Sequence, residues 1–305
     1  MKNIRRGFTF SAILIFGALL SAAPSFAQMP GSSSGHPASQ QQLPPPLPSS
    51  PDNSTPAAAP AATPAAKPAP APAPKVDPAE DTDYKAFLAL KPEDDDKRIE
   101  LGEAFVQKYP SGRYTEAIYS QLTQAEYNKR DFAKMYADSD KALAMNPDDV
   151  TVLVITGFVI PHVYNPNDID ADAKLDKAEK YEKHAIETLA TMPKPANLTD
   201  EQFTKTKALA ESQAHSALGL TYFRKQNFAD AVTELNKGTS TATSPDPTDY
   251  YVLGVSLGHL DRFADAADAY NKCAAIPGGL QERCKLAADD AKKSAATKPA
   301  PPAKP

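Results

Sequence analysis

The sequence predicts an all-α fold built from antiparallel helix pairs. The stretch FADA occurs at Phe228–Ala231 and again at Phe263–Ala266, 35 residues later. After each Phe, apolar residues follow at offsets of three, four and seven, which is one face of an α-helix. A second amphipathic segment with the same offsets precedes each copy, and a short polar turn joins the two segments. The period therefore covers two helices and the turn between them.

Two glycines follow the same period. Gly219 and Gly254 are also 35 residues apart, and each lies in the first helix of its predicted pair. Glycine inside a helix is about 1 kcal/mol less favourable than alanine. Its presence at matching positions predicts that the paired helix approaches the backbone closely there.

These segments resemble the tetratricopeptide repeat (TPR), a helix–turn–helix of about 34 residues. Two units carry the resemblance most clearly, 212–245 and 247–280. The first matches at Leu218, Gly219, Tyr222, Phe228, Ala231, Leu235 and the small Gly238. The second matches at Tyr250, Leu253, Gly254, Phe263, Ala266, Tyr270 and the small Cys273, with its proline one position early at Pro277. The resemblance implies a TPR α-solenoid, a stack of antiparallel helix pairs that binds proteins or peptides.

Two further units are less regular. Residues 116–149 match at Tyr119, Leu122, Phe132, Ala142 and Pro147 and depart from the pattern at Thr123, Met135 and Ser139. Residues 150–193 form an interrupted unit, in which Gly157 and Ala178 are 21 residues apart where 12 is usual. The excess is a predicted loop insertion from Pro161 to about Ala171.

The segment 192–203 separates two halves of the predicted array. Thr199 and Gln202 have the spacing of a capping box, with Thr as the N-cap and Gln at N3. We expect the helix that starts there to run unbroken to about Lys225 and to lie along the array as a spacer.

The flanks of the helical region, which we place at 81–294, differ from it in composition. Residues 1–27 have the basic start, short apolar run and final Ser25-Phe26-Ala27 of a signal peptide, although an uncleaved anchor is an alternative. Residues 28–80 hold 15 of the 30 prolines and no Phe or Tyr, so we predict a disordered linker. Residues 295–305 repeat this composition as a disordered tail. We therefore expect an exported protein, periplasmic or associated with the cell envelope, with secretion as an alternative.

Charge and hydropathy limit the partners. The net charge is −5, and basic residues are scattered among acidic ones, which argues against nucleic acid as a partner. No second apolar run is long enough to span a membrane, so we expect no transmembrane helix once the signal is removed. The sequence leaves the oligomeric state open.

The two cysteines are predicted to form a disulfide. Cys273 and Cys284 lie at equal distances from the turn Gly278-Gly279, so an antiparallel helix hairpin would place them opposite each other. An exported chain can form such a bond. It would fix a capping helix at 280–294.

No motif predicts catalysis, a metal site or a cofactor. Asp168, Asp170 and Asp172 begin like a calcium-binding loop, but Ala173 stands where that loop needs Gly. Acidic residues at the start of a helix are the more ordinary explanation. His215 lies at a helix packing position, which indicates a core or interface role.

The remaining candidate site is the inner groove that the TPR resemblance implies. Its predicted lining is mostly apolar and aromatic, which suits an amphipathic helix or an extended apolar segment of a partner. An alternative is that another helix of this chain fills the groove. The predicted partner-binding residues are Gln124, Tyr127, Phe158, Leu220, Phe223, Tyr251 and Val255.

Three functions are compatible with these observations. The first is a non-catalytic exported TPR scaffold that mediates protein–protein interaction in the bacterial cell envelope. The second is a secreted enzyme, or its accessory domain, with a site in the 161–200 region. The third is a structural envelope component that self-associates through its exposed repeat ends.

Overall fold

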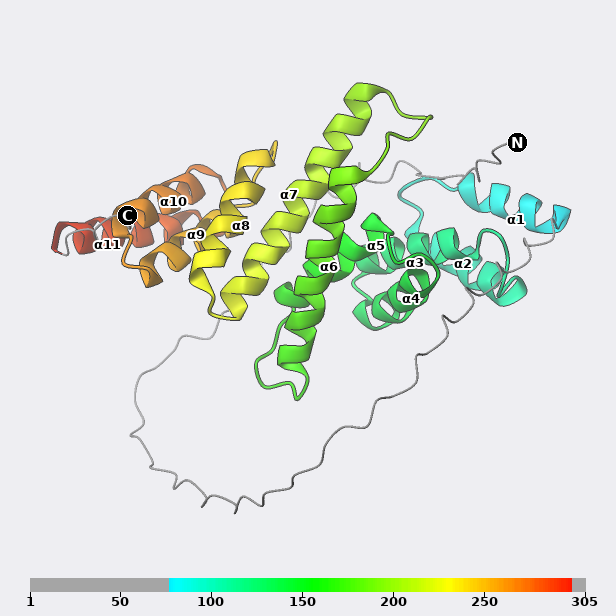
Figure 1. The fold of residues 1–305 in the computed structure, drawn as a ribbon, viewed down its shortest axis with the longest axis horizontal. Coiled ribbons are helices and arrows are strands. Elements are labelled where there is room, and N and C mark those ends of the chain that lie inside the picture. Colours follow the sequence, from blue (N-terminus) through cyan, green and yellow to red (C-terminus); the bar gives the residue numbers. More distant parts are fainter. Residues whose placement is uncertain (1–76, 298–305) are drawn as a thin grey trace, which may run out of the picture. The chain divides into compact units, whose positions relative to one another are not determined.

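The computed structural model describes residues 77–297, and every regular element among them is an α-helix, as predicted. Helices that follow one another in the chain pack side by side (Figure 1). The described region is thus an all-α solenoid of antiparallel helix pairs. Its helices are α1 (Pro78–Leu88), α2 (Asp95–Lys108), α3 (Thr115–Lys129), α4 (Phe132–Met145), α5 (Val150–His162), α6 (Ala171–Thr191), α7 (Asp200–Arg224), α8 (Phe228–Thr241), α9 (Pro247–His259), α10 (Phe263–Ala275) and α11 (Gln281–Thr297).

Side-chain caps define where many of these helices begin. A side-chain oxygen before the helix accepts a hydrogen bond from a backbone N–H of the first turn, which otherwise has no partner. Thr199 and Gln202 bond reciprocally at the start of α7, which confirms the predicted capping box. The capping residues with such a bond are Asp77, Asp131, Asp149, Thr199, Asn227 and Asp246.

The turns inside three helix pairs have the same backbone geometry. Arg130, Gln226 and Asp261 all have a φ near 60° and lie two residues before α4, α8 and α10. In each turn the next residue donates its N–H to a carbonyl five positions earlier, at 2.9 Å. A left-handed residue at the end of a helix satisfies carbonyls that would otherwise have no partner. The repeat is therefore visible in the backbone as well as in the sequence.

The two equally spaced glycines lie where helices come close together, which confirms that prediction. A Cβ on Gly219 would be 2.6 Å from Cγ of Leu235, and one on Gly254 would be 2.6 Å from the ring of Tyr270. Leu235 and Tyr270 are themselves 35 residues apart. Only glycine lets α7 approach α8, and α9 approach α10, this closely.

The interrupted unit uses the same contact with a different residue. Gly157 of α5 faces Glu182 of α6, and a Cβ on Gly157 would lie in direct collision with the carboxyl group of Glu182, 2.7 Å from its Cδ. The connection between α5 and α6 is the irregular segment 163–170, and α5 itself continues through Pro161 to His162. The inserted residues thus form a loop, and the helix contact on either side of it is kept.

Helix α7 is continuous from Asp200 to Arg224, in line with the prediction of one long helix. The expectation that it acts as a spacer is wrong, because it packs against α5 and α6 as well as α8. Ala210 and Ala214 are buried in an apolar cluster with Leu153 and Leu189. Small side chains at these points allow the long helix to join the two halves of the array.

The C-terminal end is closed by α11, which packs on α10. Cys273 and Cys284 form a disulfide between these helices, with their Cα atoms 5.8 Å apart. Both cysteines are fully buried, and Ala288 and Ala291 of α11 extend the apolar core. The cap thus covers an apolar face of α10 that would otherwise meet water.

The predicted repeat units begin at residue 116, so α1 and α2 lie before them. Tyr84, Phe87 and Phe105 of α1 and α2 pack with Leu122 of α3 in one apolar cluster. The helices extend slightly beyond 81–294, since α1 begins at Pro78 and α11 ends at Thr297. The predicted signal peptide, most of the predicted linker and the end of the predicted tail lie outside the described residues.

Candidate functional site

The predicted partner-binding residues all lie on the first helices of the pairs. These helices are α3, α5, α7 and α9, and each contacts the next one in the series. The structure gathers the residues into two groups, one on α3 and α5 and the other on α7 and α9. We call their combined surface the helix-A surface.

The first group is centred on two aromatic rings. Tyr127 of α3 and Phe158 of α5 meet edge to face, with ring centroids 6.4 Å apart. Both side chains are half-buried. They line a pocket of about 20 Å³ together with Val154 and with Gln213 of α7. That volume suits about one water molecule, so the pocket itself cannot take a ligand side chain.

The second group belongs to a larger apolar cluster. Leu220 is buried there, whereas Phe223, Tyr251 and Val255 are half-buried at its edge. The ring of Tyr251 lies 5.7 Å from that of Tyr270 and is covered by Arg283, whose Cζ is 4.8 Å from the ring centroid. Stacking of this kind keeps an aromatic side chain in place while one face or edge stays accessible.

Gln124 differs from the other predicted residues because it is buried, with 4% of its surface exposed. Its side-chain amide donates to Oδ1 of Asn128 at 3.2 Å, one turn further along α3. In this conformation it is held by its own helix and is not presented to a partner.

Two histidines extend the aromatic surface and were missed in the sequence. His162 stacks on Phe158 at 4.0 Å, and its Nδ1 lies 2.7 Å from the carbonyl oxygen of Phe158. His259 stacks on Phe228 at the same distance. Burial lowers the pKa of His162, although the hydrogen bond to the Phe158 carbonyl and the charge of Asp246 oppose this shift, so burial favours the neutral ring. Each histidine is the last residue of the first helix in its pair, and this shared position could have identified both of them in the sequence.

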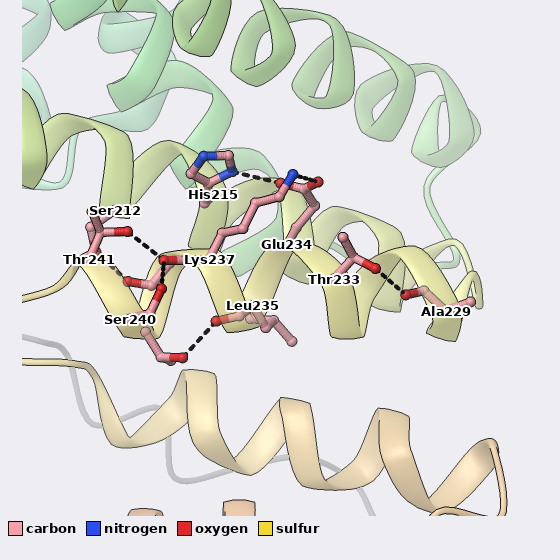
Figure 2. A network of polar contacts seen from close by, with 11 residues as sticks. Ser212, His215, Ala229, Thr233, Glu234, Leu235, Lys237, Ser240 and Thr241 are labelled. Atoms are coloured by element: carbon pink, nitrogen blue, oxygen red, sulfur yellow. Dashed lines mark hydrogen bonds and ion pairs between the residues drawn. The ribbon is translucent and has the colours of Figure 1, made fainter. Parts of the chain in front are cut away.

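His215 has an interface role, as its packing position indicated. Its Nδ1 lies 2.6 Å from Oε2 of Glu234 on α8, and Lys237 pairs with the other oxygen of that carboxylate at 2.9 Å. Ser212 donates to the carbonyl of Gly238 at 2.9 Å. Figure 2 shows these polar contacts between α7 and α8. The contacts of His215 and Ser212 bind the two helices of one pair to each other.

The acidic loop before α6 is organised around a lysine. Nζ of Lys174 lies 2.9 Å from carboxylate oxygens of both Asp168 and Asp170. Asn165 also donates to Asp168, at 2.8 Å. The polar side chains of this loop thus satisfy one another. Within residues 77–297, no cluster of three or more His, Cys, Asp or Glu side chains could hold a metal ion.

Comparison with known proteins finds similar solved structures but no similar sequence family. No family model matches the chain, and no curated protein matches it. Among solved structures it resembles a thermophilic TPR protein from Thermus thermophilus, with 13% identity and a TM-score of 0.43 over 70% of this chain and 99% of that one. The assignment of the fold depends on the helix pairs, turns and glycine contacts of the chain itself. In the part of the chain that the structure describes, no helix has both the length and the apolar character of a membrane span.

Proposed function

We propose that this chain is a non-catalytic scaffold that binds another protein through the helix-A surface. One observation carries the proposal. Four aromatic residues from successive first helices, Tyr127, Phe158, Phe223 and Tyr251, are only half-buried although each packs against an apolar cluster. Aromatic side chains in such settings are enriched at protein interfaces and dominate their binding energy.

The chemistry of this surface indicates the kind of partner. Its accessible side chains are half-buried aromatic and aliphatic groups, and burial favours the neutral form of its half-buried histidine, His162. A partner segment with apolar anchors, such as an amphipathic helix, would bury these groups with little loss of hydrogen bonding. The shallow pocket at Phe158 means that such a segment would lie across the surface and would not insert a side chain deeply.

We further propose that the protein acts in the bacterial cell envelope after export. The signal-like residues 1–27 motivate this proposal, and a disulfide at Cys273–Cys284 is compatible with an oxidising compartment. The proline-rich residues before the helical region would let it reach a partner at a distance from an anchor.

The test is chemical crosslinking of the tagged chain in intact cells, followed by identification of the captured proteins. Phe158→Ala combined with Phe223→Ala should abolish capture of the specific partner. The matched control is Ile169→Ala combined with Leu286→Ala, because both side chains are apolar and more than half exposed, and lie elsewhere. Capture that survives the first pair of substitutions would overturn the proposal. Capture of only a second copy of the chain would indicate self-association instead.

A further inference from the structure

A second pocket lies between α2, α3 and α4 and includes none of the predicted partner-binding residues. Its volume is about 250 Å³, and its lining comes from all three helices. A buried water needs only about 10–15 Å³, so this pocket has room for a larger group. Glu126 and Asp138 are its buried members, whereas Glu103, Lys134 and Lys141 surround them with side chains that are about half exposed.

The charges of the pocket do not balance. Lys134 pairs with Glu103 at 2.7 Å, and Lys141 pairs with Asp138 at 2.8 Å. Each ammonium group therefore already has a carboxylate. Glu126 is left over: its side chain is completely buried, and no hydrogen-bond donor or cation from another residue pairs with either of its carboxyl oxygens. Such a group is costly to bury unless something neutralises it.

Without a bound cation, Glu126 is neutralised by a proton. Burial raises the pKa of Glu126 to about 8, and Asp138 acts in the same direction, both through its charge and by accepting a hydrogen bond from the protonated Glu126. Lys134 opposes this rise, and Asp131 adds a smaller increase. A positively charged group placed beside Glu126 would displace this proton and form the missing ion pair.

The rest of the lining fits an alkyl chain. Val106 of α2 and Ala137 of α4 offer apolar side chains, and Tyr119 of α3 offers an aromatic ring. The Nζ of Lys141 already lies 4.9 Å from the centroid of that ring. Aliphatic walls leading to one unpaired carboxyl are complementary to a lysine side chain, whose methylene stem prefers apolar contacts and whose end is an ammonium group.

We propose that this pocket binds an alkylammonium group, with Glu126 as the anionic partner of the ammonium and Tyr119, Val106 and Ala137 as contacts for the alkyl stem. The group has two candidate sources, a lysine side chain of a protein and a free polyamine. The site is separate from the helix-A surface, so its failure would leave the proposed function untouched.

The test is isothermal titration calorimetry of the full-length chain with three probes at about pH 8. They are a blocked Gly-Lys-Gly peptide, its norleucine analogue and putrescine. We expect the lysine peptide or putrescine to bind, and the norleucine peptide to bind about tenfold more weakly or not at all, because it lacks the ammonium group. The tighter of the two amines identifies the source. If neither the lysine peptide nor putrescine binds with a Kd below about 10 mM, the affinity is negligible and the proposal is overturned.

Two matched variants locate the site. Glu126→Gln keeps the shape of the side chain and should weaken binding by about tenfold or more, whereas Glu103→Gln, at the exposed edge, should change it by about threefold or less. Binding by the native chain should tighten between about pH 6 and pH 9, because Glu126 must lose its proton. Circular dichroism checks that both variants are folded. Equal affinity of Glu126→Gln and the native chain, or tighter binding at the lower pH, would contradict the assignment.

Discussion

Replacement of Gly219 by alanine should destabilise the protein, although alanine is the better helix former. Helix propensity alone would make Gly219→Ala more stable by about 1 kcal/mol. The new methyl group would lie 2.6 Å from Cγ of Leu235 and 3.0 Å from the backbone nitrogen of the same residue. The backbone atom cannot move without a shift of α8, and overpacking of this kind costs about 1–3 kcal/mol. We therefore expect a net loss of about 1 kcal/mol, measured as a lower midpoint of thermal unfolding by circular dichroism.

Gly258→Ala is the matched control, because no atom lies within 4 Å of a Cβ placed at Gly258 of α9. It should be neutral or stabilise the protein by up to about 1 kcal/mol. Leu235→Ala should by itself lower the free energy of unfolding by about 2–5 kcal/mol. Because it also removes most of the side chain that a methyl group at position 219 would meet, Gly219→Ala should cost less in the Leu235→Ala background than in the native chain. A Gly219→Ala protein that is as stable as Gly258→Ala would refute the close approach of α7 and α8.

Three further outcomes follow from the structure. Burial raises the pKa of Glu182 well above 4.5, so the folded protein holds the proton of Glu182 more tightly than the unfolded chain does. The free energy of unfolding should therefore be highest below about pH 4.5 and fall as the pH rises. Glu182→Leu should remove this fall, and the variant should unfold at a higher temperature than the native chain at pH 8. Equal pH dependence of both proteins would contradict this. Cys284→Ser should lower the free energy of unfolding by about 3 kcal/mol, and thiol titration should detect no free thiol in the native chain before reduction. Gln226→Gly should raise the free energy of unfolding by about 1 kcal/mol, because Gln226 has a φ of 60° and glycine adopts this left-handed conformation without strain. A less stable variant would show that the contacts of the Gln226 side chain outweigh this backbone strain.

The helix pairs were predictable from the sequence because the same contacts recur at a fixed interval. FADA marks the start of α8 and of α10, and its second alanine, Ala231 or Ala266, is buried in both. Gly219 and Gly254 predicted close helix contacts because a glycine inside a helix needs a compensating reason. The capping box at Thr199 placed the start of α7 correctly because caps are local and depend on few residues.

The position of α7 was not predictable in the same way. Its length follows from local signals, but its neighbours depend on Ala210 and Ala214, whose small side chains carry little hydrophobic signal in a sequence. The α1–α2 pair lies outside the predicted repeat units for a related reason. Phe87 and Phe105 are buried with Leu122 of α3, but Leu101-Gly102 of α2 has no Leu-Gly counterpart 35 residues later, unlike Leu218-Gly219.

The two buried glutamates show what a repeat pattern alone overlooks. Glu126 follows Leu122 by four residues, as Tyr222 follows Leu218, so an acidic group occupies a position that is aromatic elsewhere. Glu182 likewise faces Gly157 where Leu235 faces Gly219. In the sequence of a single repeat unit, a glutamate at such a position only makes the match to the TPR pattern weaker. The structure shows that both carboxyl groups are buried and that no hydrogen-bond donor from another residue pairs with them.

The most direct test of the proposed function is to map where a partner touches the chain. A photoreactive phenylalanine analogue would be placed singly at Phe158 and Tyr251 on the helix-A surface, and at Ile169 and Leu286 as exposed controls. We expect covalent adducts with the same partner protein from the first two positions and none from the controls. Equal adducts from all four positions, adducts from the controls alone, or crosslinks only within the chain itself would contradict binding through the helix-A surface.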